Sequence, residues 1–245
     1  MIKRVRGAVC VFACLLLFAG AFPLAALSFW VDGETGGAFT GYNDVQIPSD
    51  SEDDPGTRFS LAEDLEPSPV WFYRLQAGVD IGRHSVFGLY APFTVESTGK
   101  ADKEISFKKK TFPEGSDLTG TFKFNSYRLS YTYTFFRRPE IELAAGLTGK
   151  VRDAYIKLEN DEKSPARTNL GFVPLIHLYA RWHFAPPFSL LLDGDGLAAP
   201  QGRAEDFLLA LVYSLDEKTD IRLGYRLLEG GSDGAGGVYT FSMFH

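Results

Sequence analysis

The chain has 245 residues with 25 Lys and Arg against 31 Asp and Glu, so its formal net charge is −6. An acidic balance of this kind excludes nucleic acid from the expected partners. Beyond the first thirty residues no stretch of 18 consecutive apolar residues occurs, which excludes a helical membrane span there.

The N-terminus has the three regions of a secretory signal peptide. Three basic residues among the first six precede an apolar run over residues 7–21, and small residues follow it at Ala26-Leu27-Ser28. We therefore predict a signal peptide over 1–28 and one mature domain over 29–245. An uncleaved anchor is the alternative. Both cysteines of the chain lie inside the apolar run, so the mature chain has no thiol chemistry.

The rest of the chain is dominated by runs in which apolar and polar residues alternate with period two. This period is typical of β-strands whose two faces meet different surroundings. In chain order the predicted strands are 29–42, 70–81, 86–97, 120–136, 141–159, 171–184, 188–199, 206–215, 220–229 and 238–245.

The connections between these strands alternate in length. Polar and often long links at 43–69, 98–119, 160–170 and 230–237 alternate with tight links of three or four residues, such as "RRPE" and "APP". Short turns at one rim and longer loops at the other are typical of bacterial outer-membrane barrels.

The two parities separate an apolar from a charged surface. In "SYRLSYTYTFF", residues 126–136, the odd positions are aromatic or apolar and most even positions are polar, including Arg128. If the polar face is internal, each charge can find a partner of opposite sign. The candidate internal polar network is Asp32, Glu34, Arg74, Arg128, Lys150, Arg152, His177, Arg181, Asp193, Asp195, Arg222 and Arg226.

Together these features resemble the small outer-membrane β-barrel proteins of Gram-negative bacteria. The resemblance implies an all-β, antiparallel up-and-down transmembrane β-barrel, with ten strands preferred and eight as the alternative. Members usually end on an aromatic residue read by the barrel-assembly machinery, whereas this chain ends on Phe244 and His245. The last strand is therefore expected to be short or truncated.

The expected function is that of a non-enzymatic outer-membrane protein with an envelope or surface-interaction role and an interior filled by side chains. Ten strands leave at most a narrow, obstructed passage. A narrow anion-preferring pore is the second hypothesis, and an outer-membrane hydrolase using Asp193 and Asp195 is the third. That pair resembles the Asp-x-Asp of omptin proteases, but no Asp-x-His accompanies it.

Few other residues suggest chemistry, and we expect no cofactor and no metal. His177 lacks a second His or Cys at metal-binding spacing and is expected in a hydrogen-bond network. The basic loop ending in Lys108, Lys109 and Lys110 is interpreted as a solvated loop or as a contact for the anionic head groups of lipopolysaccharide. The expected partners are outer-membrane lipid, lipopolysaccharide and the barrel-assembly machinery.

Overall fold

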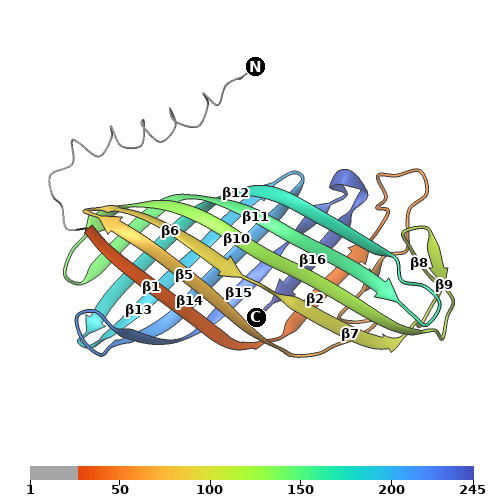
Figure 1. Cartoon of the computed structure of the whole chain (residues 1–245), viewed down its shortest axis with the longest axis horizontal. Helices are drawn as coiled ribbons and strands as arrows, with labels where there is room; N and C mark the ends of the chain where they lie inside the picture. Colours follow the sequence, from red (N-terminus) through yellow and green to blue (C-terminus); the bar gives the residue numbers. More distant parts are fainter. Residues whose placement is uncertain (1–26) are drawn as a thin grey trace, which may run out of the picture.

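The computed structural model describes residues 27–245, which form one strongly curled antiparallel sheet (Figure 1). The signal-peptide prediction lies outside the described residues, except that Leu27 and Ser28 open the first strand. In this range only η2 (Ala235–Gly237) is helical, a single 3-10 turn. None of the described residues belongs to a helix long and apolar enough to cross a membrane. The prediction of an all-β antiparallel fold is confirmed.

The sheet has 14 strands, most of them joined to their neighbours in chain order. Two additional short strands pair only with each other, as a separate hairpin. Along the path of the sheet the strands are β1 (Leu27–Ala38), β5 (Val70–Ile81), β6 (His84–Ala91), β10 (Asp117–Arg137), β11 (Ile141–Glu159), β12 (Ala166–Ala185), β13 (Phe188–Ala199), β14 (Gly202–Ser214), β15 (Asp220–Asp233), β16 (Tyr239–Phe244), β2 (Thr40–Gln46) and β3 (Phe59–Ser60). Beside this path β7 (Thr94–Lys100) pairs with β10, and β4 (Glu66–Pro67) pairs with β7; β8 (Ile105–Phe107) and β9 (Lys110–Phe112) form the hairpin.

The sheet curls back on itself, because β1 and β2 lie near opposite ends of the strand order but are consecutive in the chain. The strands β1 and β2 are separated by a single residue, Phe39, yet β1 pairs with β5 and β2 pairs with β16. Phe39 itself exchanges two backbone hydrogen bonds with His245, with N···O distances of 2.8 and 2.9 Å. The predicted strand 29–42 is thus two strands that pair with different neighbours. Ten strands in a closed barrel stay a prediction.

The two ends of the curled sheet differ in their connections. Tight connections join β5 to β6, β10 to β11, β12 to β13 and β14 to β15 at one end, which we call the turn end. Most of the longer connections, residues 47–69 and 101–116 among them, lie at the opposite end, the loop end. Figure 1 shows the β8–β9 hairpin at the loop end. The predicted alternation of short and long links is therefore present.

Apolar side chains point outward from the curled sheet. Leu223, Leu209 and Ile176 expose 82%, 52% and 47% of their surface, whereas Arg128 is buried. Along β10, Tyr127 is exposed and Ser126 is buried, and this alternation continues to Thr134. A soluble half-buried sheet would have the opposite orientation. The orientation is the one that the sequence predicted.

The interior at the loop end is apolar, which the sequence analysis did not predict. Two connections that the sequence suggested were polar loops supply its residues. Phe59, Leu61 and Leu65 come from 47–69, and Phe107 and others come from the β8–β9 hairpin. Phe59 and Phe107 meet edge to face, with 6.1 Å between ring centroids. We call this set the loop-end core: Val45, Ile47, Phe59, Leu61, Leu65, Val95, Ala101, Ile105, Phe107, Phe112, Leu118, Phe122, Ile156, Leu158 and Phe244.

Candidate functional site

The charged residues of the interior converge on Asp206, the first residue of the predicted strand 206–215. Its carboxylate accepts hydrogen bonds from Arg74 Nη1 at 3.0 Å and from Arg226 Nη1 at 2.5 Å, and it also pairs with Arg128. These three arginines come from β5, β15 and β10. One buried carboxylate therefore joins strands on different sides of the curled sheet.

A second group of ion pairs connects β1 to β15, two strands that share no backbone pairing. Glu34 accepts hydrogen bonds from Arg226 Nε at 2.6 Å and from Arg222 Nη2 at 3.1 Å. Arg222 also holds both oxygens of Asp32, one of them at 2.7 Å. Bidentate guanidinium–carboxylate pairs of this kind are strong and directional. Side chains thus bridge β1 and the first part of β15, which precedes the residues paired with β16.

A third group surrounds His177 on β12. The imidazole lies between two carboxylates of β13, with Nδ1 3.0 Å from Asp195 and Nε2 3.3 Å from Asp193. Asp195 also accepts hydrogen bonds from Arg128 at 2.6 Å and from Thr148 at 2.7 Å. Both ring nitrogens of His177 therefore face carboxylates.

We call these ten residues the ionic cluster: Asp32, Glu34, Arg74, Arg128, His177, Asp193, Asp195, Asp206, Arg222 and Arg226. It contains five carboxylates and four guanidinium groups. Because buried charges are costly unless they are paired, the near balance of signs stabilises the arrangement. Nine of the ten were candidates from the sequence.

A glycine allows the central strands to approach closely at the cluster. A Cβ atom on Gly194, between Asp193 and Asp195, would lie 2.3 Å from the backbone oxygen of Asp206. Only glycine fits where a neighbouring backbone approaches this closely. The "DGDG" sequence thus serves the packing of β13 against β14 as well as the placement of its two carboxylates.

The remaining candidates lie outside the cluster. Arg181 contacts Asp220 at 2.7 Å near the turn end. Lys150 is buried, with Nζ 4.4 Å from the centroid of the Phe124 ring. Arg152 donates to Asn169 Oδ1 at 2.6 Å and forms no ion pair with the carboxylates of residues 27–245.

Asp206 is the one member of the cluster that the sequence analysis missed. Its inward-facing neighbours along β14 are Leu208, Ala210 and Val212, which are apolar and buried. The sequence pattern therefore suggested that Asp206 was a polar residue at the start of an apolar strand. The available signal was its position in the alternation, because Asp206 has the same parity as the inward residues of β14. In the structure it lies opposite Asp195 in the β13–β14 ladder.

The space left around Asp206 and His177 is very small. A cavity lined by Arg74, Arg128, His177, Asp195 and Asp206, among others, has a volume of about 10 Å³. This is about the volume needed for one water molecule. A larger cavity of about 350 Å³ lies beside it and is lined by other parts of the cluster, including Glu34, Arg222 and Arg226. Side chains therefore fill the interior tightly around Asp206 and His177 and leave more space toward β1 and β15.

The three candidate lysines lie on the β8–β9 hairpin and are exposed. Lys108 and Lys109 form its two-residue turn with φ values of +50° and +60°, a conformation that favours glycine or asparagine. Lys108 Nζ donates to the backbone oxygen of Ala166 at 2.7 Å. The hairpin thus presents cations at the loop end in a defined turn.

No protein-family model and no curated protein matches the chain. One similar solved structure is the crystal structure of Ail, the attachment invasion locus protein of Yersinia pestis, with 14% identity, 80% of this chain and 99% of that chain covered, and a TM-score of 0.35. Another is Ail in complex with the heparin analogue sucrose octasulfate, with 12% identity, 87% and 96% covered, and a TM-score of 0.32.

Similarities this distant carry no conclusion about function. The resemblance to small outer-membrane β-barrel proteins is a resemblance of fold, and this chain's own architecture carries it. The features concerned are an antiparallel curled sheet, apolar side chains on its outside and alternating connection lengths.

Proposed function

We propose that this chain is an integral outer-membrane β-barrel protein without enzymatic activity, with a closed, side-chain-filled interior and a role in the envelope or in surface interactions. In this proposal residues 1–28 are a cleaved export signal and residues 29–245 form a barrel of ten strands. The ionic cluster fixes the arrangement of the strands, and the loop end meets the outside of the cell.

The single observation that carries the proposal is the outward apolar surface. Side chains such as Leu129, Leu147, Phe172, Leu211 and Leu223 are exposed around the sheet. An exposed apolar surface of this extent marks a protein or membrane contact. Its coverage of successive strands favours lipid over a single partner, because a partner would cover one side only.

The alternation of connections supports the orientation. Outer-membrane barrels have short turns on the periplasmic side and longer loops on the extracellular side. The turn end would then face the periplasm, and the exposed lysines 108–110 would face the cell surface. There they would meet phosphorylated lipopolysaccharide head groups, which attract cations.

The geometry of the ionic cluster argues against a pore. Ion conduction requires a continuous aqueous path, whereas the cavity around Asp206 and His177 has a volume of about 10 Å³. In the larger cavity of about 350 Å³ beside it, the lining arginines are held by carboxylates. The protein is therefore expected to give no steady conductance in planar bilayers.

The same cluster argues against hydrolysis by Asp193 and Asp195. A general base needs a free lone pair within reach of its water. His177 has both nitrogens against carboxylates, and Asp195 is already engaged by Arg128 and Thr148. We therefore assign the pair a structural role.

Fractionation with heat-modifiable gel mobility tests the proposal. The expected result is recovery in the detergent-soluble outer-membrane fraction, with the unboiled protein migrating differently from the boiled one. Replacement of Lys108, Lys109 and Lys110 by Gln should weaken retention on lipopolysaccharide without changing the mobility shift. Release of the wild-type protein into the periplasm without detergent would contradict the proposal.

A further inference from the structure

A separate cavity lies on the loop-end side of the ionic cluster. Its volume is about 130 Å³, comparable with engineered apolar cavities of about 150 Å³ that bind benzene. Apolar walls come from Phe122, Ile156, Leu228, Val238 and Phe244. The walls therefore suit a small apolar body of about the size of one aromatic ring.

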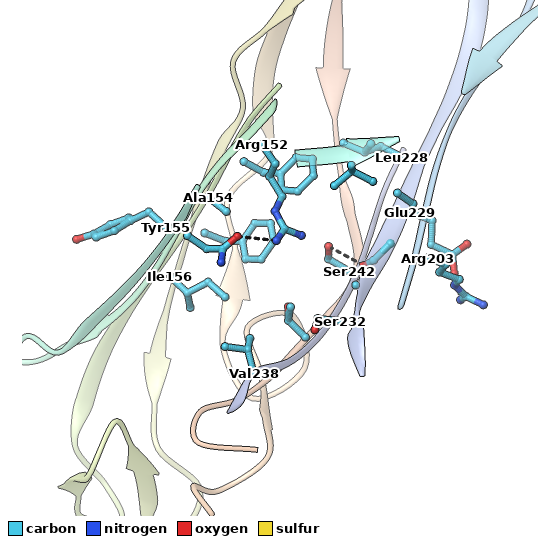
Figure 2. A pocket seen from close by; sticks show the side chains of 18 of the residues that line it. Arg152, Ala154, Tyr155, Ile156, Arg203, Leu228, Glu229, Ser232, Val238 and Ser242 are labelled. Atoms are coloured by element: carbon cyan, nitrogen blue, oxygen red, sulfur yellow. Dashed lines mark hydrogen bonds and ion pairs between the residues drawn. The ribbon is translucent and has the colours of Figure 1, made fainter. Parts of the chain in front are cut away.

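Two arginines give this cavity a cationic side. Figure 2 shows Arg152 pointing into the cavity from β11, whereas Tyr155 points away from it. Arg167 enters from β12 and donates to the backbone oxygen of Gly236 at 3.1 Å. Within residues 27–245 neither guanidinium forms an ion pair, and Nε of each is buried without a hydrogen-bond partner, as is Oγ1 of Thr240.

These donors distinguish the cavity from the ionic cluster. In the cluster, each guanidinium has a carboxylate, whereas Arg152 has only the neutral Asn169 and Arg167 only a backbone carbonyl. A buried or half-buried cation without a counter-charge is costly, so an anion placed between these groups would be stabilised. Lys150 also lines this cavity, with Nζ 4.4 Å from the centroid of the Phe124 ring.

The cavity has an access route at its polar side. Asn169, which lines it beside Arg152, is exposed, and the η2 turn with Gly236 covers the adjacent part. A ligand entering from the loop end would place its charged group at the arginines and its apolar body against the aromatic walls.

From these observations we propose that this cavity binds a small organic monoanion with a compact apolar body, of the class of aromatic or short-chain carboxylates. The carboxylate would accept hydrogen bonds from Arg152 and Arg167, and the ring or chain would pack against Phe122 and Leu228. The proposed site is separate from the ionic cluster. It does not depend on whether the barrel conducts ions.

Calorimetric titration of the purified full chain with benzoate tests this proposal, with benzamide as the neutral analogue of the same shape. We expect saturable binding of benzoate and binding of benzamide at least about tenfold weaker, since a hydrogen bond to a charged group is stronger than one to a neutral group by about this factor. Equal binding of the two compounds, or no saturable binding of benzoate, would overturn the proposal.

Four variants locate the binding. Arg152→Gln and Arg167→Gln should each weaken benzoate binding about tenfold or more, whereas the exposed turn-end control Arg83→Gln should leave it unchanged. Ala154→Phe, which fills the cavity from β11, should abolish binding. Each variant is first tested for the heat-dependent mobility shift of the folded protein. If folded Ala154→Phe binds benzoate like the wild type, or if sulfate binds as tightly as benzoate, the assignment is wrong.

Discussion

The two halves of the interior are filled in different ways by the same sheet. Along β10, the inward positions Leu118 and Phe122 belong to the apolar loop-end core, while Arg128 belongs to the ionic cluster nearer the turn end. The core is completed by chain segments that fold in from the loops, and the cluster is completed by side chains of the strands alone. The apolar half depends on inserted segments, whereas the charged half depends on strand-to-strand ion pairs.

This difference predicts that mutations in the two halves destabilise different parts of the structure. Loss of a charge in the cluster affects arginines on several strands and should lower the stability of the whole sheet. Loss of an apolar group from an inserted hairpin should loosen the loop end and leave the strands paired.

The largest effect is expected for Asp206→Asn. The change keeps the volume of the side chain but leaves Arg74, Arg128 and Arg226 without their shared counter-charge. Removing one partner of a buried ion pair costs about 3 to 5 kcal/mol. The temperature at which the folded gel mobility is lost should fall sharply, whereas the exposed turn-end control Glu217→Gln should not change it. A wild-type transition in Asp206→Asn would show that the cluster does not hold the strands.

Phe107→Ala should have a smaller and local effect. The side chain is fully buried against Phe59, and truncation of a buried Phe costs about 3 kcal/mol or more at the site. Because β8 and β9 form a separate two-stranded sheet, we expect faster proteolysis within 47–69 and 101–116 and an unchanged mobility transition. The matched control is Thr111→Ala, an exposed position on the same hairpin. If Phe107→Ala lowered the temperature of the mobility transition as much as Asp206→Asn does, the two halves of the interior would not be independent.

A still smaller effect is expected at the pair that bridges β1 and β15. Asp32 and Arg222 are partly exposed, so their coupling should be near the 1.5 kcal/mol of a charged hydrogen bond. A double-mutant cycle with Asp32→Asn and Arg222→Gln measures it directly from chemical unfolding. A coupling energy near zero would mean that other contacts hold β1 and β15 together.

The sequence predicted the fold because alternation is a local property. The run 126–136 separates an apolar from a polar face in its own residues, but which face is internal had to be inferred from the links and charges of the rest of the chain. The long and short links required no knowledge of pairing. Contacts in the cluster are different, since Arg74 and Asp206 are 132 positions apart and nothing in either neighbourhood specifies the other. Asp206 was missed because its strand offers apolar residues at the next inward positions.

The loop-end core could not be predicted for a related reason. Phe59 and Leu61 stand in a segment without periodicity, preceded by the acidic stretch "DSEDDPG". Their burial depends on the space left between β2 and β7, which short pairings of β3 with β2 and of β4 with β7 help to fill. Such space is a property of the assembled sheet. Local composition therefore indicated a solvated loop where the chain folds inward.

Tryptophan fluorescence tests the central claim, that the outside of the curled sheet meets lipid, most directly. The chain has three tryptophans: Trp71 and Trp182 point outward and are exposed, while Trp30 is half-buried, packs against Phe87 and donates to Asp80. In single-tryptophan variants reconstituted with brominated lipids, we predict strong quenching of Trp182 and little quenching of Trp30. Quenching of Trp182 by aqueous acrylamide but not by brominated lipid would contradict the account.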